Sequence, residues 1–127
     1  MLPFSIGLKP GMPVAEQILF AVKKAVATGQ LSPGDPFPSV RVLSQELRIN
    51  PNTAHKVIAA LVIQGVLITT PAIGSLVAVR SPGGSRERAE LLGAELERVV
   101  VEAKNLGLTI DEVQAGLVAQ WKRLTRK

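Results

Sequence analysis

The sequence contains no cysteine and only one histidine among its 127 residues. Without cysteine there is neither a disulfide framework nor a thiolate ligand for a metal ion. A lone histidine, here His55, is more often an ordinary surface or core residue than a catalyst. The sequence also has no phosphate-binding loop, nucleophile elbow or metal-ligand spacing. These absences argue against an enzyme, and we expect no catalytic residues, no metal and no cofactor.

Long apolar runs are also missing. No stretch approaches the roughly 20 apolar residues that a membrane span requires, and the N-terminus lacks the basic start and long apolar core of a signal peptide. We therefore expect a cytoplasmic protein without a membrane segment. A chain of this length has room for one domain and a small appendage.

Acidic residues are few in the first part of the chain. Residues 1–80 hold seven basic and three acidic side chains, whereas residues 81–127 hold eight and seven. Most of the net charge of +5 therefore lies in the N-terminal part, as the binding of nucleic-acid phosphates would require. A modest basic excess also occurs in proteins that bind no nucleic acid, so this signal is weak by itself.

What the chain does contain is most informative between residues 29 and 79. This stretch predicts two short helices joined by a tight turn and followed by a hairpin, which is the plan of a winged helix-turn-helix. The hairpin is predicted from the apolar runs 66–68 and 76–79, which are separated by a break at residues 71–74. A further amphipathic helix, about residues 13–28, is expected before the pair.

The second helix of the pair can be laid out residue by residue. Asn50 is a suitable N-cap, because its side-chain oxygen can accept a hydrogen bond from a free N–H of the first turn. Pro51 fits the first helical position, where its missing N–H costs nothing, and Gly65 can end the helix in a left-handed conformation. One apolar stripe at helical spacing consists of Ala54, Val57, Ile58 and Leu61.

The opposite face of this helix carries Asn52, His55 and Lys56 beside the small Ala59. Asparagine pairs well with adenine edges, and histidine or lysine can contact guanine or a phosphate. We therefore expect this face to enter the major groove of DNA. The residues alone would equally suit an ordinary solvated helix face.

The preceding helix has a similar two-sided pattern. Ser39 is a suitable N-cap after a stiff, proline-rich approach. Ile49, in the short turn between the helices, is expected to be an apolar plug that fixes the angle between them. The buried face is expected to hold Val40, Leu43 and Leu47, and the outward face Arg41, Gln45 and Arg48.

The segment GQLSPGDPFPSVRVLSQEL resembles the signature of the GntR family of bacterial transcription regulators. The resemblance covers about residues 9–79, and its most specific parts are LSPG at residues 31–34 and PSVR at residues 38–41. The string NPNT at residues 50–53 resembles the YtrA-type subgroup in particular. That subgroup has a very short C-terminal region, as here.

This resemblance implies roles for particular residues. Arg41 corresponds to the family's arginine at the helix–DNA contact, Ser39 to a hydroxyl that contacts phosphate, and Gly74 to the wing-tip glycine that enters the minor groove. The positions that reach bases or backbone are occupied here by Asn50, Asn52, Thr53 and His55.

The sequence departs from the family pattern in two places. Pro51 and His55 stand where relatives often have arginine, and the wing, residues 69–75, carries no charge. We therefore expect the wing to add little, and the operator to differ from the family norm.

The C-terminal part is expected to form a separate unit. Residues 81–85 are a linker by composition, which divides a DNA-binding domain at residues 1–80 from a helical region at residues 86–127. Two helices, about 86–106 and 110–125, are predicted there as a hairpin.

The two C-terminal helices carry more apolar residues than a fragment of about 40 residues can bury. The first has a coiled-coil-like seam, and Thr109 and Glu112 form a capping box for the second. We expect a symmetric homodimer in which two hairpins pack as a helical bundle, although the hairpin could instead pack on its own N-terminal domain. The expected interface consists of Leu92, Leu96, Val99, Ala103, Leu106, Val113, Leu117, Trp121 and Leu124.

The sequence therefore predicts a mainly α-helical protein with a small β-hairpin: an N-terminal winged helix-turn-helix and a C-terminal two-helix dimerisation hairpin. We expect a sequence-specific transcriptional regulator, a repressor, that binds a palindromic double-stranded operator as a homodimer. The alternative is a winged-helix replication or architectural DNA-binding protein without effector-controlled regulation. A small-molecule effector has no support in the sequence, and a pocket for one could exist only between domains or at the dimer interface.

Overall fold

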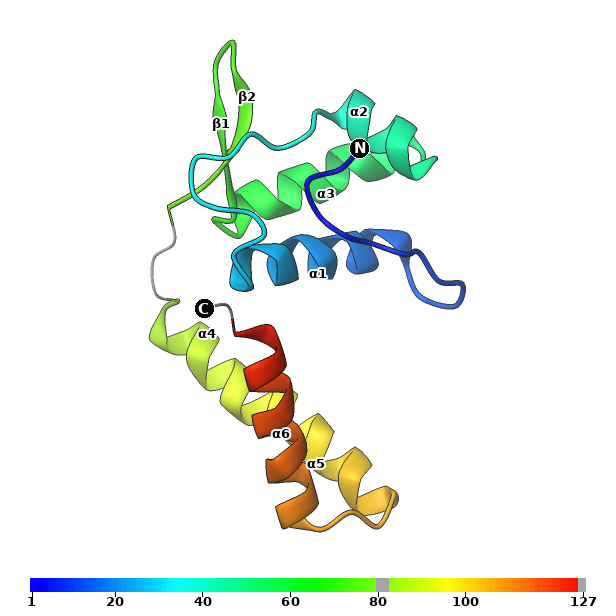
Figure 1. Cartoon of the computed structure of the whole chain (residues 1–127), viewed down its shortest axis with the longest axis vertical. Helices are drawn as coiled ribbons and strands as arrows, with labels where there is room; N and C mark the ends of the chain where they lie inside the picture. The colour runs from blue at the N-terminus through cyan, green and yellow to red at the C-terminus, as the bar shows by residue number, and fades with distance from the viewer. Residues whose placement is uncertain (80–82, 126–127) are drawn as a thin grey trace. The chain divides into compact units, whose positions relative to one another are not determined.

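The computed structural model describes residues 1–79 and 83–125. The chain divides into two compact units, Met1–Arg80 and Ser81–Thr125. Helices dominate both units, and a single antiparallel hairpin lies in the first (Figure 1). This confirms the predicted fold class. None of the helices in the described part of the chain is long and apolar enough to cross a bilayer.

The N-terminal unit is built around one central helix. The element order is α1 (Val14–Ala27), α2 (Val40–Leu47), α3 (Pro51–Ile63), β1 (Leu67–Thr70) and β2 (Gly74–Val77). Helix α3 contacts α1, α2 and β1 (Figure 1). The core between these elements consists of Phe4, Ile18, Val22, Ala25, Leu31, Phe37, Leu43, Ala54, Val57, Leu61, Leu67 and Val77.

Helix α3 begins and ends where its local chemistry predicts. The side-chain oxygen of Asn50 accepts a hydrogen bond from the backbone N–H of Asn52 at 2.8 Å, and Pro51 is the first helical residue. Gly65 has φ +77°, and the next N–H, of Val66, donates to the carbonyl of Leu61 at 2.9 Å. A residue in the left-handed region lets the chain turn back and satisfy a terminal carbonyl, for which glycine is best suited.

The wing is larger than the sequence predicts. Strands β1 and β2 pair from Leu67↔Val77 to Thr70↔Gly74, and a third short segment joins them through a bridge between Pro36 and Leu76. The N–H of Phe37 donates to the carbonyl of Ser75 at 2.9 Å. Strand β2 is therefore paired on both sides, with β1 on one side and with the segment that leads into α2 on the other. This segment holds the outer edge of the wing in place.

The N-terminal segment also belongs to the core, although no pattern in the sequence predicts this. Phe4 is buried and stacks on Phe37 with ring centroids 5.8 Å apart. Gln17 of α1 ties this segment down, because its amide donates to the carbonyls of Lys9 and Met12 and its oxygen accepts from the N–H of Lys9. The loop before α1 is thus fixed by side-chain hydrogen bonds rather than by regular structure.

The C-terminal unit contains one long helical run and a second helix. The run comprises α4 (Ser85–Glu90), a π-helical segment η1 (Leu91–Glu95) and α5 (Leu96–Asn105), and the second helix is α6 (Ile110–Leu124). The capping box at the start of α6 forms as predicted, with Thr109 Oγ1 accepting from Glu112 N–H at 3.2 Å.

Two details of this unit correct the expected boundaries. Ser85 is helical rather than part of a linker, because Glu87 reaches back to accept the N–H of Gly84 at 3.2 Å and so starts the helix there. The expected linker residues 81–82 lie outside the described residues. The expected single α-helix is interrupted by the π-helical segment η1. A π turn contains about one residue more than an α turn. Leu92 is therefore out of register with the apolar seam that continues along α5.

Candidate nucleic-acid interface

Helix α3 presents an open polar face at its N-terminal end. Ala54 and Val57 are buried in the core, whereas Asn52, His55 and Lys56 are exposed. Helical spacing separates these two sets of residues onto opposite sides of the helix. The three residues that the sequence predicted to face DNA therefore lie together on the surface of one helix end.

The remaining predicted positions on α3 are less open. Thr53 is half-buried, so only part of its side chain is available to a partner. Ala59 is also half-buried, and its small side chain leaves space beside the exposed face. Asn50 is exposed, but its Oδ1 atom is already engaged in capping the helix.

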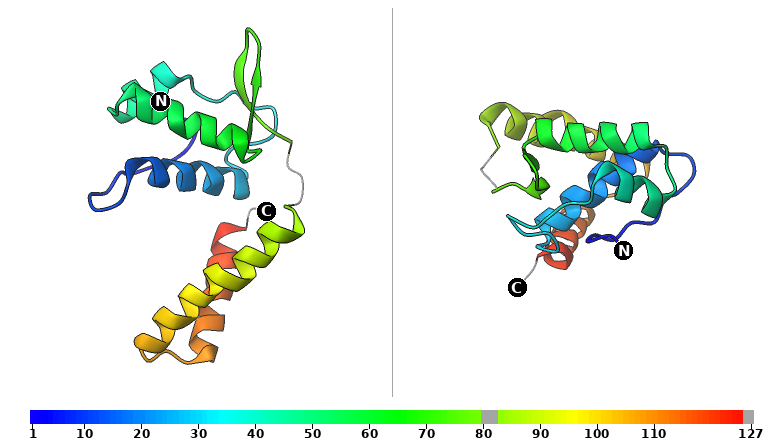
Figure 2. Two further views of the ribbon diagram at one scale, coloured as in Figure 1. Left: turned by 180° about the vertical axis from the view of Figure 1, so that it is seen from behind. Right: turned by 90° about the horizontal axis from the view of Figure 1, so that it is seen from above.

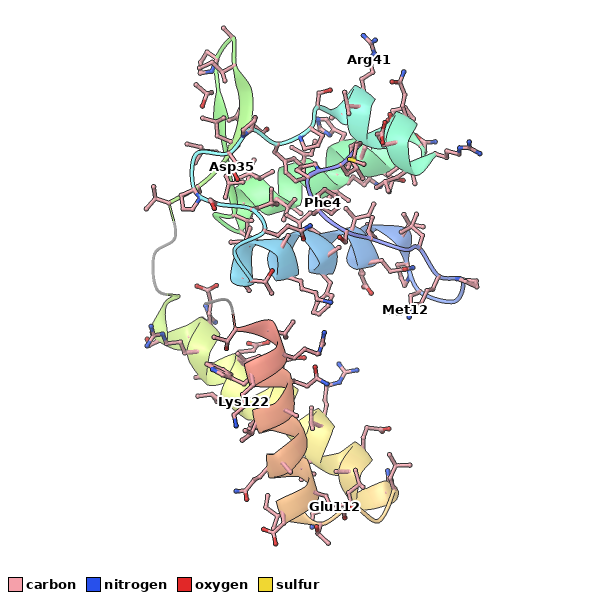
Figure 3. The ribbon with its side chains drawn as sticks, viewed as in Figure 1. Phe4, Met12, Asp35, Arg41, Glu112 and Lys122 are labelled. Carbon is pink, nitrogen blue, oxygen red and sulfur yellow. The ribbon has the colours of Figure 1, made fainter. Side chains whose placement is uncertain are left out.

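Helix α2 places a hydroxyl and a guanidinium at its start. Ser39 Oγ accepts a hydrogen bond from the N–H of Val42 at 3.2 Å, as an N-cap. Arg41 is exposed and extends away from the helix into solvent (Figure 3). Leu43 is fully buried and anchors α2 on α3, so both helices offer their free residues from one packed module.

In the described part of the chain, the cations of α2, α3 and the turn between them have no side-chain partners. Within the described residues, no ion pair or side-chain hydrogen bond involves the side chains of Arg41, Arg48 or Lys56. Residues 40–77 contain these three cations and one acid, Glu46. A surface of unpaired cations and amide groups suits the phosphate backbone and the base edges of DNA.

The tip of the wing is apolar. Thr70 pairs with Gly74, so the loop consists of Pro71, Ala72 and Ile73. Gly74 thus stands at the base of the loop, in β2, with φ +96°, and Ile73 is 68% exposed. The predicted wing-tip residue is therefore next to the tip rather than at it, and the loop offers backbone and apolar contacts but no charge. The views from the front and from behind show the hairpin extending as a narrow projection from the helices of this unit (Figures 1 and 2).

The turn between α2 and α3 has an unusual backbone. Arg48 follows the last residue of α2 with φ 54° and ψ 49°, in the left-handed region. Helical spacing predicts Arg48 on the outward face of α2, but no sequence motif gives it a role. Its position between two helices in a three-residue turn is the signal that could have drawn attention to it, because such a turn needs a residue with positive φ.

The C-terminal unit holds a groove rather than a core. The groove has a volume of about 620 Å³ and lies between α5 and α6. Its apolar lining consists of Leu96, Val99, Ala103, Leu106, Leu108, Val113 and Leu117. Of the residues that the sequence assigned to an interface, Ala103 is buried within the unit and Val113 and Leu124 are half-buried, while the others are exposed.

Helices α1 to α3 and the hairpin define a winged helix-turn-helix protein. The profile described as "Bacterial regulatory proteins, gntR family" matches residues 14–77, which include all of these elements. The chain therefore belongs to the GntR family, and it is a helix-turn-helix transcriptional regulator. This confirms the resemblance that the sequence motifs indicated.

Two curated relatives come from Bacillus subtilis (strain 168). The HTH-type transcriptional repressor YtrA is 26% identical over 102 residues, which are 80% of this chain and 78% of YtrA. The uncharacterized HTH-type transcriptional regulator YhcF is 29% identical over 104 residues, which are 82% of this chain and 83% of YhcF. The likeness to YtrA agrees with the predicted subgroup, and it extends beyond the winged helix-turn-helix.

Solved structures resemble this chain in two ways. A transcriptional antiterminator from Listeria monocytogenes EGD-e is 28% identical with a TM-score of 0.81, over 94% of this chain and 89% of that one. The DNA-binding domain of AraR in complex with operator ORR3 is 26% identical with a TM-score of 0.50, over 58% of this chain and 89% of that one. The first match spans both units, and the second covers a shorter part of the chain.

Proposed function

We propose that this regulator binds a specific operator through α2 and α3 and represses transcription there. The observation that carries the proposal is the open polar face of α3, where Asn52, His55 and Lys56 are exposed beside an exposed Arg41. Asparagine can recognise adenine and lysine or arginine can contact guanine or phosphate. The operator complex of AraR and the repressor name of YtrA support this role. Bacterial DNA lies in the cytoplasm, where we expect the protein to act.

We also propose that the protein binds its operator as a homodimer. In the C-terminal unit only Ala103 is buried among the described residues, although Leu117 is 59% and Trp121 74% exposed. Exposed apolar surface on this scale is unfavourable in water. A second copy of the unit offers the same apolar residues, so a symmetric pair would cover both grooves at once.

Selection of bound sequences from a random DNA pool tests the proposed function. We expect a palindromic motif, because two copies of α3 related by a two-fold axis read two half-sites. Binding of all sequences with equal affinity and strong salt dependence would instead indicate an architectural protein. Transcription from a promoter that carries the selected motif should fall when the protein is added, and a rise would contradict repression.

A further inference from the structure

Arg48 occupies a backbone position that disfavours it. It is the C-cap of α2, with φ 54° and ψ 49°. In this left-handed region the Cβ atom of an L-residue comes close to the backbone, so glycine is the favoured residue and asparagine the next best. The turn between the helices therefore contains a long, charged residue where a smaller one would be less strained.

The side chain of Arg48 has no structural role in the described part of the fold. The backbone N–H of Arg48 donates to the carbonyl of Ser44, which any residue except proline could do. The side chain is exposed, and within the described part of the chain it makes no ion pair or hydrogen bond. Neither packing nor capping therefore accounts for a guanidinium at this position.

The position of Arg48 is close to the start of α3. Arg48 lies two positions before the N-cap Asn50, with only Ile49 between them, and two steps along the chain span at most about 7 Å. The exposed Asn52 and His55 lie in the first two turns of the same helix. A DNA strand that borders these residues would lie within reach of a long side chain in the turn.

Residues 40–77 contain few cations, so each of them should contribute a large share of the affinity for DNA. Residues 57–79 contain no charged residue at all, which includes the entire wing. Residues 40–77 therefore rely on Arg41, Arg48 and Lys56 alone to neutralise phosphates. Affinity for DNA depends strongly on the number of phosphates that cations neutralise, so a third contact at Arg48 would matter to a module with so few.

We propose that Arg48 contacts a phosphate of the operator beside the N-terminus of α3, and that the strained turn is retained because it presents this side chain to the DNA backbone. The inference rests on the proposed operator binding and adds to it a residue outside the predicted reading face. Because a phosphate contact is independent of base identity, Arg48 supplies affinity and positioning rather than sequence preference.

Three substitutions at Arg48 separate its charge from its backbone conformation. In Arg48→Ala the charge is lost while the disfavoured φ remains. In Arg48→Gly both the charge and the strain are removed, and in Arg48→Lys the charge and the strain are both kept. Lys23→Ala, on the exposed side of α1, is the matched loss of a cation outside the helix-turn-helix pair.

The measurements are the affinity for a selected operator across a range of salt concentrations and the thermal midpoint of each variant. For Arg48→Ala and Arg48→Gly we expect several-fold weaker binding to every sequence. The salt slope, which is the slope of the logarithm of the binding constant against the logarithm of the salt concentration, should fall in magnitude by about 0.9 per half-site. The midpoint of Arg48→Gly should equal or exceed that of the wild type. Arg48→Lys and Lys23→Ala should bind with nearly wild-type affinity and slope.

The outcomes distinguish this inference from the proposed function. Wild-type affinity and slope in Arg48→Ala, while the wild type binds its operator, would overturn the role of Arg48 and leave operator binding intact. Weaker binding with an unchanged salt slope would also overturn it, because the turn geometry rather than the charge would then matter. Failure of the wild type to select any sequence would instead refute the proposed function.

Discussion

At the scale of single residues, the caps of α2 and α3 determine which groups remain for DNA. Ser39 Oγ and Asn50 Oδ1 each accept a backbone N–H of their own helix. The donors of both side chains remain unused by the caps: the hydroxyl hydrogen of Ser39 and the amide hydrogens of Asn50. Phosphate oxygens only accept hydrogen bonds, so these donors suit the DNA backbone.

Asn50→Asp should separate folding from DNA binding. Aspartate caps a helix as well as asparagine does, and its negative charge at the helix N-terminus is favourable by about 0.3–1 kcal/mol. The donor is lost, however, and the carboxylate repels phosphate. We expect an unchanged or higher thermal midpoint together with operator affinity at least tenfold lower.

The matched control for this substitution is Thr109→Asp, which makes a similar change at the N-cap of α6. It should leave operator affinity unchanged, since Thr109 lies in the other unit. Asn50→Asp with wild-type affinity would show that Asn50 does not lie next to a phosphate.

Asn52 is the residue from which we expect base recognition. Its side chain is exposed in the first turn of α3, and within the described residues its amide group makes no hydrogen bond, so the amide is available to pair with adenine. Asn52→Ala should relax specificity at one position of each half-site, at a cost of roughly 1–3 kcal/mol against the preferred base. Site selection with the variant measures this; an unchanged motif would mean that another surface reads the DNA.

At the scale of elements, the local chemistry of the chain predicts the ends of the helices well. Asn50, Pro51 and Gly65 fix α3 through interactions within one turn, so their effect can be read from the sequence. Ser39 does the same for α2. The exposed and buried faces of α3 follow from helical periodicity, and this is why most of the candidate interface could be named before the structure was known.

The features that the sequence did not predict depend on contacts between distant residues or on irregular backbone. The bridge of Pro36 to Leu76 joins segments about 40 residues apart, and proline is an unusual strand residue. Phe4 reaches the core through a segment without periodicity. The π-helical segment Leu91–Glu95 leaves no clear mark in an apolar pattern that assumes regular α-helix. The positive φ of Arg48 is likewise atypical of its residue type.

The uncharged wing offers a direct test of its contribution. Ile73 is exposed in the wing loop, and its N–H donates to the carbonyl of Thr70 at 3.2 Å. Ile73→Lys keeps this backbone and adds a cation. We expect stronger binding to all sequences and a salt slope higher by about 0.9 per half-site if the wing lies along the DNA.

Ile73→Thr is the control, because it keeps a β-branched residue without adding charge. Its affinity should stay near that of the wild type. An unchanged salt slope in Ile73→Lys would place the wing away from the DNA backbone.

At the scale of the whole molecule, the two units differ in how they are stabilised. The N-terminal unit has a continuous core around α3, whereas the C-terminal unit leaves most of its apolar residues in water. A fully buried leucine or valine contributes roughly 1.5–3 kcal/mol, and this contribution is mostly absent from an isolated C-terminal unit. We therefore infer that the C-terminal unit gains its stability from association, and that association in turn sets the spacing of two reading helices.

The double variant Leu96→Glu with Leu117→Glu tests the homodimer. Both leucines line the groove between α5 and α6, and burying an unpaired carboxylate costs several kcal/mol. The variant should sediment as a monomer at micromolar concentration, where we expect the wild type to sediment as a dimer. Its operator binding should weaken strongly, because each half-site is then bound by a separate molecule.

A control variant and a fluorescence measurement make this test specific. The control is Gln114→Glu, which adds one acid at an exposed polar position of α6 and should remain dimeric. The chain has one tryptophan and no tyrosine, so its intrinsic fluorescence reports almost entirely on Trp121, which is 74% exposed in a single chain. Dilution of the wild type should shift this emission to longer wavelength as the dimer dissociates, since the indole then enters water. A wild type that sediments as a monomer at micromolar concentration would refute the dimer and would require another cover for this apolar surface.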